Sequence, residues 1–164
     1  MAISTNGTNG ASKAGKPFPP GVHVPSLTWF LDDFNQEVDW DTQRKHLSFL
    51  IGSGLHGSKS PNKLLQVTKS LTSTVVLAGT NGEAVALTAT EKAKLVSITR
   101  ELAVSLGRPD LTVILGCGGG STRAVIEETK LAKEAGADYA LVMVPSYFHF
   151  AMNEEAIVAF FREV

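Results

Sequence analysis

The sequence predicts an α/β protein in which helices cover a parallel β-sheet. Short apolar runs with the length of strands alternate with longer segments in which apolar residues recur at helical spacing. The strand-like runs are almost continuously apolar, which is typical of strands buried on both faces of a parallel sheet. The chain has 164 residues and is 43% hydrophobic, which suits one domain with a substantial core.

The first strand–helix unit is expected to begin near residue 21. Residues 1–20 are mostly small and polar with little to bury, and this composition predicts a mobile tail. Residues 21–25 are typical of a short strand ended by proline, and residues 39–53 have the apolar spacing of a helix. The buried stripe expected for this helix is Leu47, Leu50 and Ile51.

The second unit contains the most informative turn. An apolar strand over residues 75–78 leads directly into the run Gly79-Thr80-Asn81-Gly82-Glu83. Glycines here would allow positive φ and close approach of the backbone, so the amides and side chains of Thr80 and Asn81 could bind a small anion. Asn-Gly is also a common turn dipeptide, and a purely structural turn is an equal alternative.

Three further helices are indicated by capping residues and apolar faces, two of them preceded by strands over residues 111–116 and 139–144. The expected caps are Thr88 with Glu91, Ser121 or Thr122, and Asn153. The expected inward faces are Leu95, Ile98, Leu102 and Leu106, then Ala124, Val125, Leu131, Ala132 and Ala135, then Ile157, Phe160, Phe161 and Val164.

Two later loops also carry residues that could do chemistry. The run Gly116-Cys117-Gly118-Gly119-Gly120-Ser121 could cradle a phosphate at a helix N-terminus, although a tight turn that keeps a pocket floor small is favoured, because neither dinucleotide nor P-loop spacing is present. Tyr147 follows the last strand, where its phenol could relay a proton or orient a carboxylate. The alternative is an aromatic plug shared with Phe148 and Phe150.

Composition argues against several classes of function. The 15 Lys and Arg nearly balance the 16 Asp and Glu without a basic stripe, so nucleic-acid binding has no support. No apolar run approaches the roughly 20 residues of a membrane span. The histidines lack ligand spacing, with His46 expected on a solvated helix face, so neither a metal nor a cofactor is indicated. The single Cys117 is expected to be a small buried hydrophobe and favours a reducing, cytoplasmic compartment.

Residues 58–74 differ from their surroundings. They are rich in Ser and Thr and carry lysines but no acidic residue. A connection from a helix to the next strand usually takes about 2–6 residues, so we expect an insertion here. A translated intron or a gene-model error would explain it, and an ordinary exposed surface loop is the alternative.

As an ordered set, these segments resemble the dihydrodipicolinate synthase and N-acetylneuraminate lyase family of class I aldolases. That family includes 4-hydroxy-2-oxoglutarate aldolase and 2-keto-3-deoxy sugar-acid aldolases. The resemblance covers residues 21–164 apart from 58–74, and it rests on Gly79-Thr80-Asn81-Gly82-Glu83, Val24-Pro25-Ser26-Leu27-Thr28, Val113 to Gly118, and Val144-Pro145-Ser146-Tyr147. It implies the first four βα units of a TIM (β/α)8 barrel, incomplete because a whole barrel takes ~250 residues.

The resemblance also implies a chemistry, namely a Schiff base between a lysine and pyruvate or another 2-oxo acid, usually in a homo-oligomer. Gly79, Thr80 and Asn81 would bind the substrate carboxylate, Thr80 would also pass a proton, and Tyr147 is similar to the family's tyrosine at the end of the fourth strand. Asn81 and Phe148 favour a sugar-acid or hydroxy-oxoglutarate aldolase over dihydrodipicolinate synthesis.

One departure from the family pattern bears on activity. The family's Schiff-base lysine lies on the sixth strand and its main catalytic tyrosine on the fifth, whereas four strands are predicted here. Lysines of the predicted units are expected on helix faces: Lys45, Lys92, Lys94, Lys130 and Lys133. We therefore expect a family member that is truncated and inactive as this chain. The alternative is a non-catalytic α/β half-barrel that binds small carboxylates or pairs with another chain.

Overall fold

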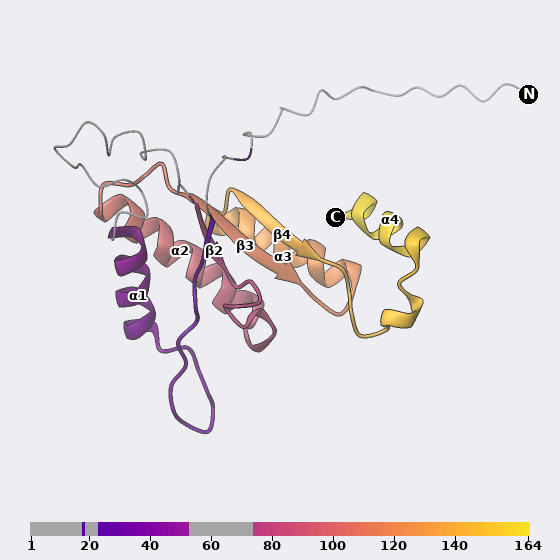
Figure 1. Ribbon diagram of the computed structural model, residues 1–164, viewed down its shortest axis with the longest axis horizontal. Helices are drawn as coiled ribbons and strands as arrows, with labels where there is room; N and C mark the ends of the chain where they lie inside the picture. Colours follow the sequence, from indigo (N-terminus) through magenta and orange to yellow (C-terminus); the bar gives the residue numbers. More distant parts are fainter. Residues whose placement is uncertain (1–17, 19–22, 53–73) are drawn as a thin grey trace, which may run out of the picture.

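A four-stranded parallel sheet organises the computed structural model, which describes residue 18, residues 23–52 and residues 74–164 (Figure 1). The strands lie in chain order: β1 (His23–Pro25), β2 (Thr74–Leu77), β3 (Thr112–Gly118) and β4 (Tyr139–Met143). Every neighbouring pair is parallel. The predicted α/β class with a parallel sheet is therefore confirmed.

Three helices form a layer over one face of the sheet, with α2 (Ala89–Ser105) between α1 (Trp40–Gly52) and α3 (Thr122–Ala135) (Figure 1). The core fills the space between this layer and the sheet, and residues 111–117, which include most of β3, are all buried. Beyond β4 the chain continues into α4 (Glu154–Glu163), which contacts α3. Short 3₁₀ helices follow β2 and β4: η2 (Ala84–Ala86) and η3 (His149–Ala151).

The register of β2 shows that the last residue of the predicted insertion belongs to the sheet. Thr74, which the insertion predicted over residues 58–74 includes, is the first residue of β2 and aligns with His23 of β1 and Thr112 of β3. Its side chain is completely buried, so it belongs to the sheet. The other residues of the predicted insertion, and those of the predicted tail except Phe18, lie outside the described residues.

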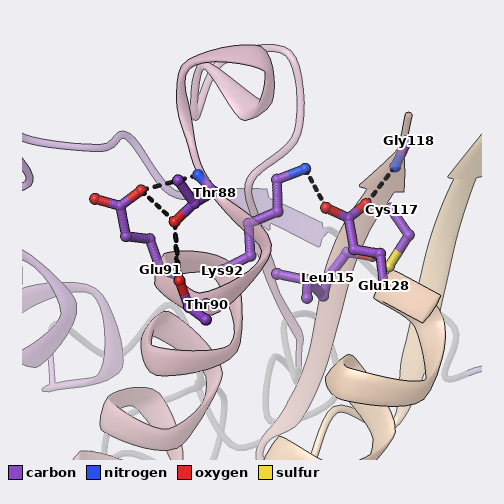
Figure 2. A network of polar contacts seen from close by, with 8 residues as sticks. All are labelled: Thr88, Thr90, Glu91, Lys92, Leu115, Cys117, Gly118 and Glu128. Atoms are coloured by element: carbon purple, nitrogen blue, oxygen red, sulfur yellow. Dashed lines mark hydrogen bonds and ion pairs between the residues drawn. The ribbon is translucent and has the colours of Figure 1, made fainter. Parts of the chain in front are cut away.

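The predicted helix caps are confirmed. The Thr88 hydroxyl accepts the Glu91 N–H at 3.3 Å, and the Glu91 carboxylate accepts the Thr88 N–H at 2.8 Å, which completes the capping box of α2 (Figure 2). Ser121, rather than Thr122, caps α3 through its side chain, and Asn153 caps α4. Local sequence therefore fixes where these three helices begin.

The predicted inward faces hold only in part. Of the α4 residues expected to face inward, only Phe160 is buried, whereas Phe161 and Val164 are 53% and 39% exposed. The reason is that α4 lies at the end of the helix layer, where α3 is its main packing partner (Figure 1). Other residues wrongly expected to be inward are Ala124, Leu131 and Leu106, all of which are exposed.

The two edge strands of the sheet are β1 and β4. Among the described strands β4 pairs only with β3, so its other edge is open, and Leu141 and Met143 on it are 48% and 40% exposed. The ring of Phe18 lies against His23 of β1 and Tyr139 of β4, with centroid distances of 4.7 and 5.1 Å. A single ring thus contacts both edge strands of the sheet.

Arg100 of α2 joins the segments that enter β3 and β4. Its Nε donates to the Gly136 carbonyl at 2.7 Å and its Nη1 to the Leu111 carbonyl at 2.5 Å. Its Nη2 pairs with Asp138, whose carboxylate also accepts the Val113 N–H. This clamp lies at the N-terminal ends of the strands, the end that serves stability in parallel α/β proteins.

Candidate active site

The turn after β2 is closed by its own backbone. The Gly79 carbonyl accepts the N–H groups of Gly82 at 3.1 Å and Ala84 at 3.3 Å, and the Thr80 carbonyl accepts the Glu83 N–H at 3.2 Å. Thr80 and the following Asn81 therefore occupy a defined turn at the carboxyl end of β2. This is the end of a parallel sheet at which ligands bind.

Two non-glycine residues adopt the left-handed region on either side of this turn, Ala78 with φ 47° and Glu83 with φ 51°. The prediction that the turn's glycines would adopt positive φ is wrong, since neither Gly79 nor Gly82 does so. Gly82 is needed for a different reason. A Cβ at this position would lie 2.9 Å from the Ser26 carbonyl oxygen, so only glycine allows the two backbones to approach this closely.

Gly116 of β3 permits a second close approach. A Cβ at Gly116 would lie 1.9 Å from the carbonyl oxygen of Ala78, so the bend that follows β2 rests directly on β3. The sequence placed Gly116 at the end of its strand, but β3 continues through Cys117 to Gly118. The turn is thus held between the loop after β1 and the backbone of β3.

The three residues predicted to bind a carboxylate differ in their exposure to solvent. Gly79 is buried, whereas Thr80 and Asn81 are exposed. Within the described part of the chain, no hydrogen bond uses the N–H or the side chain of Thr80 or Asn81. These two residues therefore present free polar groups at the carboxyl end of β2.

Tyr147 lies beyond the carboxyl end of β4 and lines a cavity of about 420 Å³. Its side chain is 79% exposed and meets Phe148 edge-on at 4.8 Å between ring centroids. Phe148 in turn meets Phe150 at 5.9 Å. Tyr147 thus has features of both predicted roles, the rim residue and the member of an aromatic group. Thr80 and Asn81 do not line this cavity, although Ala84 and Val85, which follow them in the chain, do.

A buried ion pair that sequence reasoning missed is part of the lining of this cavity. Figure 2 shows the pair and its neighbours. Lys92 of α2 places its Nζ 2.7 Å from Glu128 Oε1 of α3, and the side chains are only 4% and 10% exposed. The second oxygen of Glu128 accepts the Gly118 N–H at 2.7 Å. One carboxylate thus joins two helices to the carboxyl end of β3.

Sequence periodicity could have located this pair. Lys92 was expected on a helix face with the other lysines, yet it is 3% exposed. Lys92 lies at helical spacing from buried residues of α2, and Glu128 lies at helical spacing between buried residues of α3. These neighbours are Leu95, Val96 and Thr99 for Lys92, and Val125 and Ala132 for Glu128. Two oppositely charged residues, each within the apolar stripe of one of two adjacent helices, are the sequence signal of such a buried ion pair.

The glycine-rich run includes the end of β3, and its residues Gly118, Gly119 and Gly120 line the cavity. Because the Gly118 N–H already donates to Glu128, the favoured interpretation of this run is a tight turn rather than a phosphate cradle. Cys117 is fully buried, as expected, and its thiol lies 3.6 Å from the Leu115 carbonyl oxygen. Burial, reinforced by the nearby Glu128 carboxylate, raises the pKa of Cys117 to about 11.

His46 does not lie on a solvated face as expected. It is half-buried, its ring meets that of Trp29 edge-on at 5.9 Å, and burial lowers its pKa. Over the described ranges of the chain, no group of three or more His, Cys, Asp or Glu is placed to hold a metal ion. Nor does any helix in these ranges combine the length and the apolar composition that crossing a membrane requires.

Comparison with known proteins identifies the family. The model of the Dihydrodipicolinate synthetase family matches residues 63–164. The chain belongs to this family. A relative from Emericella nidulans, named as a mitochondrial 4-hydroxy-2-oxoglutarate aldolase, is 36% identical over 92% of the chain. The L-threo-3-deoxy-hexylosonate aldolase of Aspergillus niger is 36% identical over 90% of it. The chain spans 43% and 39% of the length of these two relatives.

Solved structures of the family share the arrangement described above. A dihydrodipicolinate synthase family protein from Coccidioides immitis has 34% identity and a TM-score of 0.67, over 89% of this chain and 40% of that one. The dihydrodipicolinate synthase of Aquifex aeolicus has 27% identity and a TM-score of 0.61, over 88% of this chain and 42% of its own. The family inferred from the sequence motifs is therefore confirmed.

Proposed function

We propose that this chain supplies the first four βα units of a (β/α)8 barrel to a pyruvate-dependent class I aldolase. The reaction is aldol cleavage or condensation of a 2-oxo acid through a Schiff base, without a cofactor. Gly79, Thr80 and Asn81 bind the carboxylate of the 2-oxo acid, and Thr80 also passes a proton. Tyr147 contributes a phenol at the same end of the sheet.

The observation that carries this proposal is the pair of free polar residues in the turn after β2. Thr80 and Asn81 leave their N–H groups and side chains unused within the described residues, and the surrounding backbone holds the turn. A carboxylate is bound well by several N–H and O–H donors that converge on it. Donors that are held in place before the ligand arrives need no reorganisation on binding.

Proton transfer is assigned to the hydroxyl of Thr80 and the phenol of Tyr147. Both side chains are exposed, so a substrate could reach them, and both groups can donate and accept a proton. A positioned acid or base contributes about 10²–10⁴-fold to the rate of such reactions. Tyr147 lines the cavity beside the sheet's carboxyl end, which is where the leaving part of a longer substrate would lie.

The substrate class follows from the residues and the relatives together. Asn81 and Phe148 are the positions at which the chain departs from the pattern expected of dihydrodipicolinate synthesis. Two curated relatives are named as a 4-hydroxy-2-oxoglutarate aldolase and an L-threo-3-deoxy-hexylosonate aldolase. We therefore propose a 4-hydroxy-2-oxo acid or a 2-keto-3-deoxy sugar acid as the substrate, with pyruvate as the shared fragment.

The described lysines are poorly placed to form the Schiff base. Lys92 is buried, and its Nζ is committed to the Glu128 carboxylate. The others described, Lys45, Lys94, Lys130 and Lys133, lie on helices rather than at the carboxyl ends of strands. A class I aldolase needs an unpaired, desolvated amine as its nucleophile. We infer that the 164-residue chain tested alone has no aldolase activity.

Two experiments on the chain test the two parts of this proposal. Titration of the ¹⁵N-labelled chain with sodium pyruvate should shift the amide signals of Thr80 and Asn81, and Thr80→Val should weaken binding, whereas Thr90→Val on the exposed face of α2 should not. Treatment with pyruvate and borohydride should leave every lysine unmodified by mass spectrometry. A lysine labelled at stoichiometric yield would contradict the inference of inactivity.

Failure of the first titration would favour the other function considered from the sequence, a non-catalytic half-barrel that pairs with another chain. The open edge of β4, with Leu141 and Met143 exposed, is the feature that would then form the interface. Self-association of the chain without pyruvate binding, measured by light scattering, would support that alternative.

The remaining assignments are also proposals. We propose a cytoplasmic location, a homo-oligomeric aldolase as the working form, and no nucleic-acid or membrane partner. Cell fractionation tests the location directly, because the Emericella relative is named as mitochondrial. We further propose a tail over residues 1–20 and an insertion over residues 58–73. The insertion ends at residue 73 because Thr74 belongs to β2. A mature transcript that retains codons 58–73 in most copies would contradict an intron origin.

A further inference from the structure

The hydroxyl of Thr28 makes a long-range contact with the turn that carries Thr80 and Asn81. Its Oγ1 donates to the carbonyl oxygen of Gly82 at 2.6 Å, and the contact is buried and spans 54 residues of sequence. The Gly82 carbonyl belongs to the same planar peptide unit as the Glu83 N–H. That N–H donates to the Thr80 carbonyl at 3.2 Å. A single peptide unit therefore connects Thr28 to Thr80.

Thr28 is itself fixed in place by a buried amide on α1. The Trp29 N–H donates to Gln43 Oε1 at 3.0 Å, and Gln43 Nε2 donates to the Leu27 carbonyl at 3.2 Å. Gln43 is completely buried, and it thus holds the backbone on both sides of Thr28. The segment also joins the sheet, because the Ser26 N–H donates to the Val76 carbonyl at 2.8 Å. The Thr28 hydroxyl is therefore presented from a rigid support.

The turn needs such support because its backbone is strained. Ala78 and Glu83 both adopt the left-handed region, which is unfavourable for residues with a Cβ. Such conformations persist only where the surrounding structure enforces them, and they are concentrated at binding and catalytic sites. The turn's own hydrogen bonds run between backbone groups of residues 79–84. Among the described residues, Thr28 is the side chain that donates to this turn from outside it.

We propose that Thr28 is a positioning residue that sets the orientation of Thr80 and Asn81 for binding of a 2-oxo acid carboxylate. Gln43 holds Thr28, Thr28 holds the Gly82–Glu83 peptide, and that peptide holds Thr80. Thr28 does not touch the substrate. This inference rests on the proposed function, since it concerns the geometry of the same carboxylate site.

The test compares Thr28→Val, which has the same shape without the hydroxyl, with Thr28→Ser, which keeps the hydroxyl. In the ¹⁵N-labelled 164-residue chain, Thr28→Val should raise the Kd for pyruvate about tenfold, the ratio that one hydrogen bond supports. Thr28→Ser should bind within about twofold of the unaltered chain. Hydrogen exchange at the Gly82 and Glu83 amides should accelerate about tenfold in Thr28→Val only. If the valine variant does not fold, Thr28→Ala replaces it.

A matched control separates positioning from loss of stability. Arg100→Lys weakens the clamp at the opposite end of the strands and does not touch the turn, so it should lower stability while leaving the Kd for pyruvate unchanged. Equal loss of binding in Arg100→Lys and Thr28→Val, or unchanged binding in Thr28→Val, would overturn the inference.

An unaltered chain that does not bind pyruvate would contradict the proposed function instead. The exchange rates of Gly82 and Glu83 would then decide by themselves whether Thr28 positions the turn. Rates in Thr28→Val that match those of the unaltered chain would overturn the inference in that case too.

Discussion

Lys92 Nζ lies 2.7 Å from Glu128 Oε1, with both side chains almost completely removed from solvent. The charges are not isolated, because Glu128 also accepts the Gly118 N–H at 2.7 Å (Figure 2). Taking two charges out of water costs free energy that their attraction only partly offsets. The intact pair is therefore expected to add little net stability, whereas removal of one partner should destabilise the chain strongly.

We expect Lys92→Met to lower the free energy of unfolding by about 3–5 kcal/mol, because it leaves the Glu128 charge buried without its partner. The double variant Lys92→Met with Glu128→Leu should recover much of that loss. Urea unfolding of the single and double variants measures both effects. A matched control is the exposed pair of Arg123 and Glu127, with side chains 88% and 62% exposed, where Arg123→Met should change stability by no more than about 0.5 kcal/mol.

Gly116→Ala should be among the most damaging single changes in the described chain. The new Cβ would stand 1.9 Å from the Ala78 carbonyl oxygen, and a backbone atom in a packed sheet cannot move far enough to relieve this overlap. We expect a loss of about 4 kcal/mol or more, or no folded protein. Gly120→Ala is the control, since nothing lies within 4 Å of its added Cβ. Equal thermal stability of the two variants would contradict the close approach of β3 to the bend after β2.

Arg100→Lys should destabilise the chain by about 2–3 kcal/mol. Arg100 donates to the Gly136 and Leu111 carbonyls and pairs with Asp138, and a lysine cannot reproduce this fork of donors. Chemical denaturation followed by circular dichroism measures the change. Arg123→Lys, at an exposed position of α3, serves as the matched control and should change stability by less than about 0.5 kcal/mol. A similar effect of the two substitutions would argue against the clamp.

Cys117 should make stability depend on pH in alkaline solution. Burial raises its pKa from 9.0 to about 11, so the folded chain keeps its thiol proton over a range in which the unfolded chain loses it. The resulting stabilisation is fully present below pH 9 and should decline as the pH rises from about 9 to 11. Urea unfolding between pH 8 and 11 measures this slope, and Cys117→Ala should reduce it. Rapid reaction of the folded chain with a thiol reagent at pH 8 would contradict the buried, protonated state.

Local sequence determined a large part of this fold. The strands at residues 75–77 and 112–116 were predictable because their apolar runs are continuous, and the starts of α2, α3 and α4 because a cap depends on residues within one turn. The positions of Thr80, Asn81 and Tyr147 at the carboxyl end of the sheet were predictable because each follows a strand, and parallel strands bring their carboxyl ends to one edge. The inward face of α4 was not predictable, because apolar periodicity does not show whether a neighbouring element covers that face of the helix.

Only the tertiary structure decided which distant residues support the site. Thr28 and Gly82 are 54 residues apart, and Lys92 and Glu128 are 36 apart, so each contact exists only because adjacent βα units pack side by side. The left-handed conformations of Ala78 and Glu83 were also not predictable, because a glycine is intrinsically the better residue for positive φ. The sequence by itself thus determined the main helices and strands, and the end of the sheet at which the proposed site lies. The packing of those elements decided the strained turn, its Thr28 support and the buried ion pair, because these depend on distances across the sheet rather than along the chain.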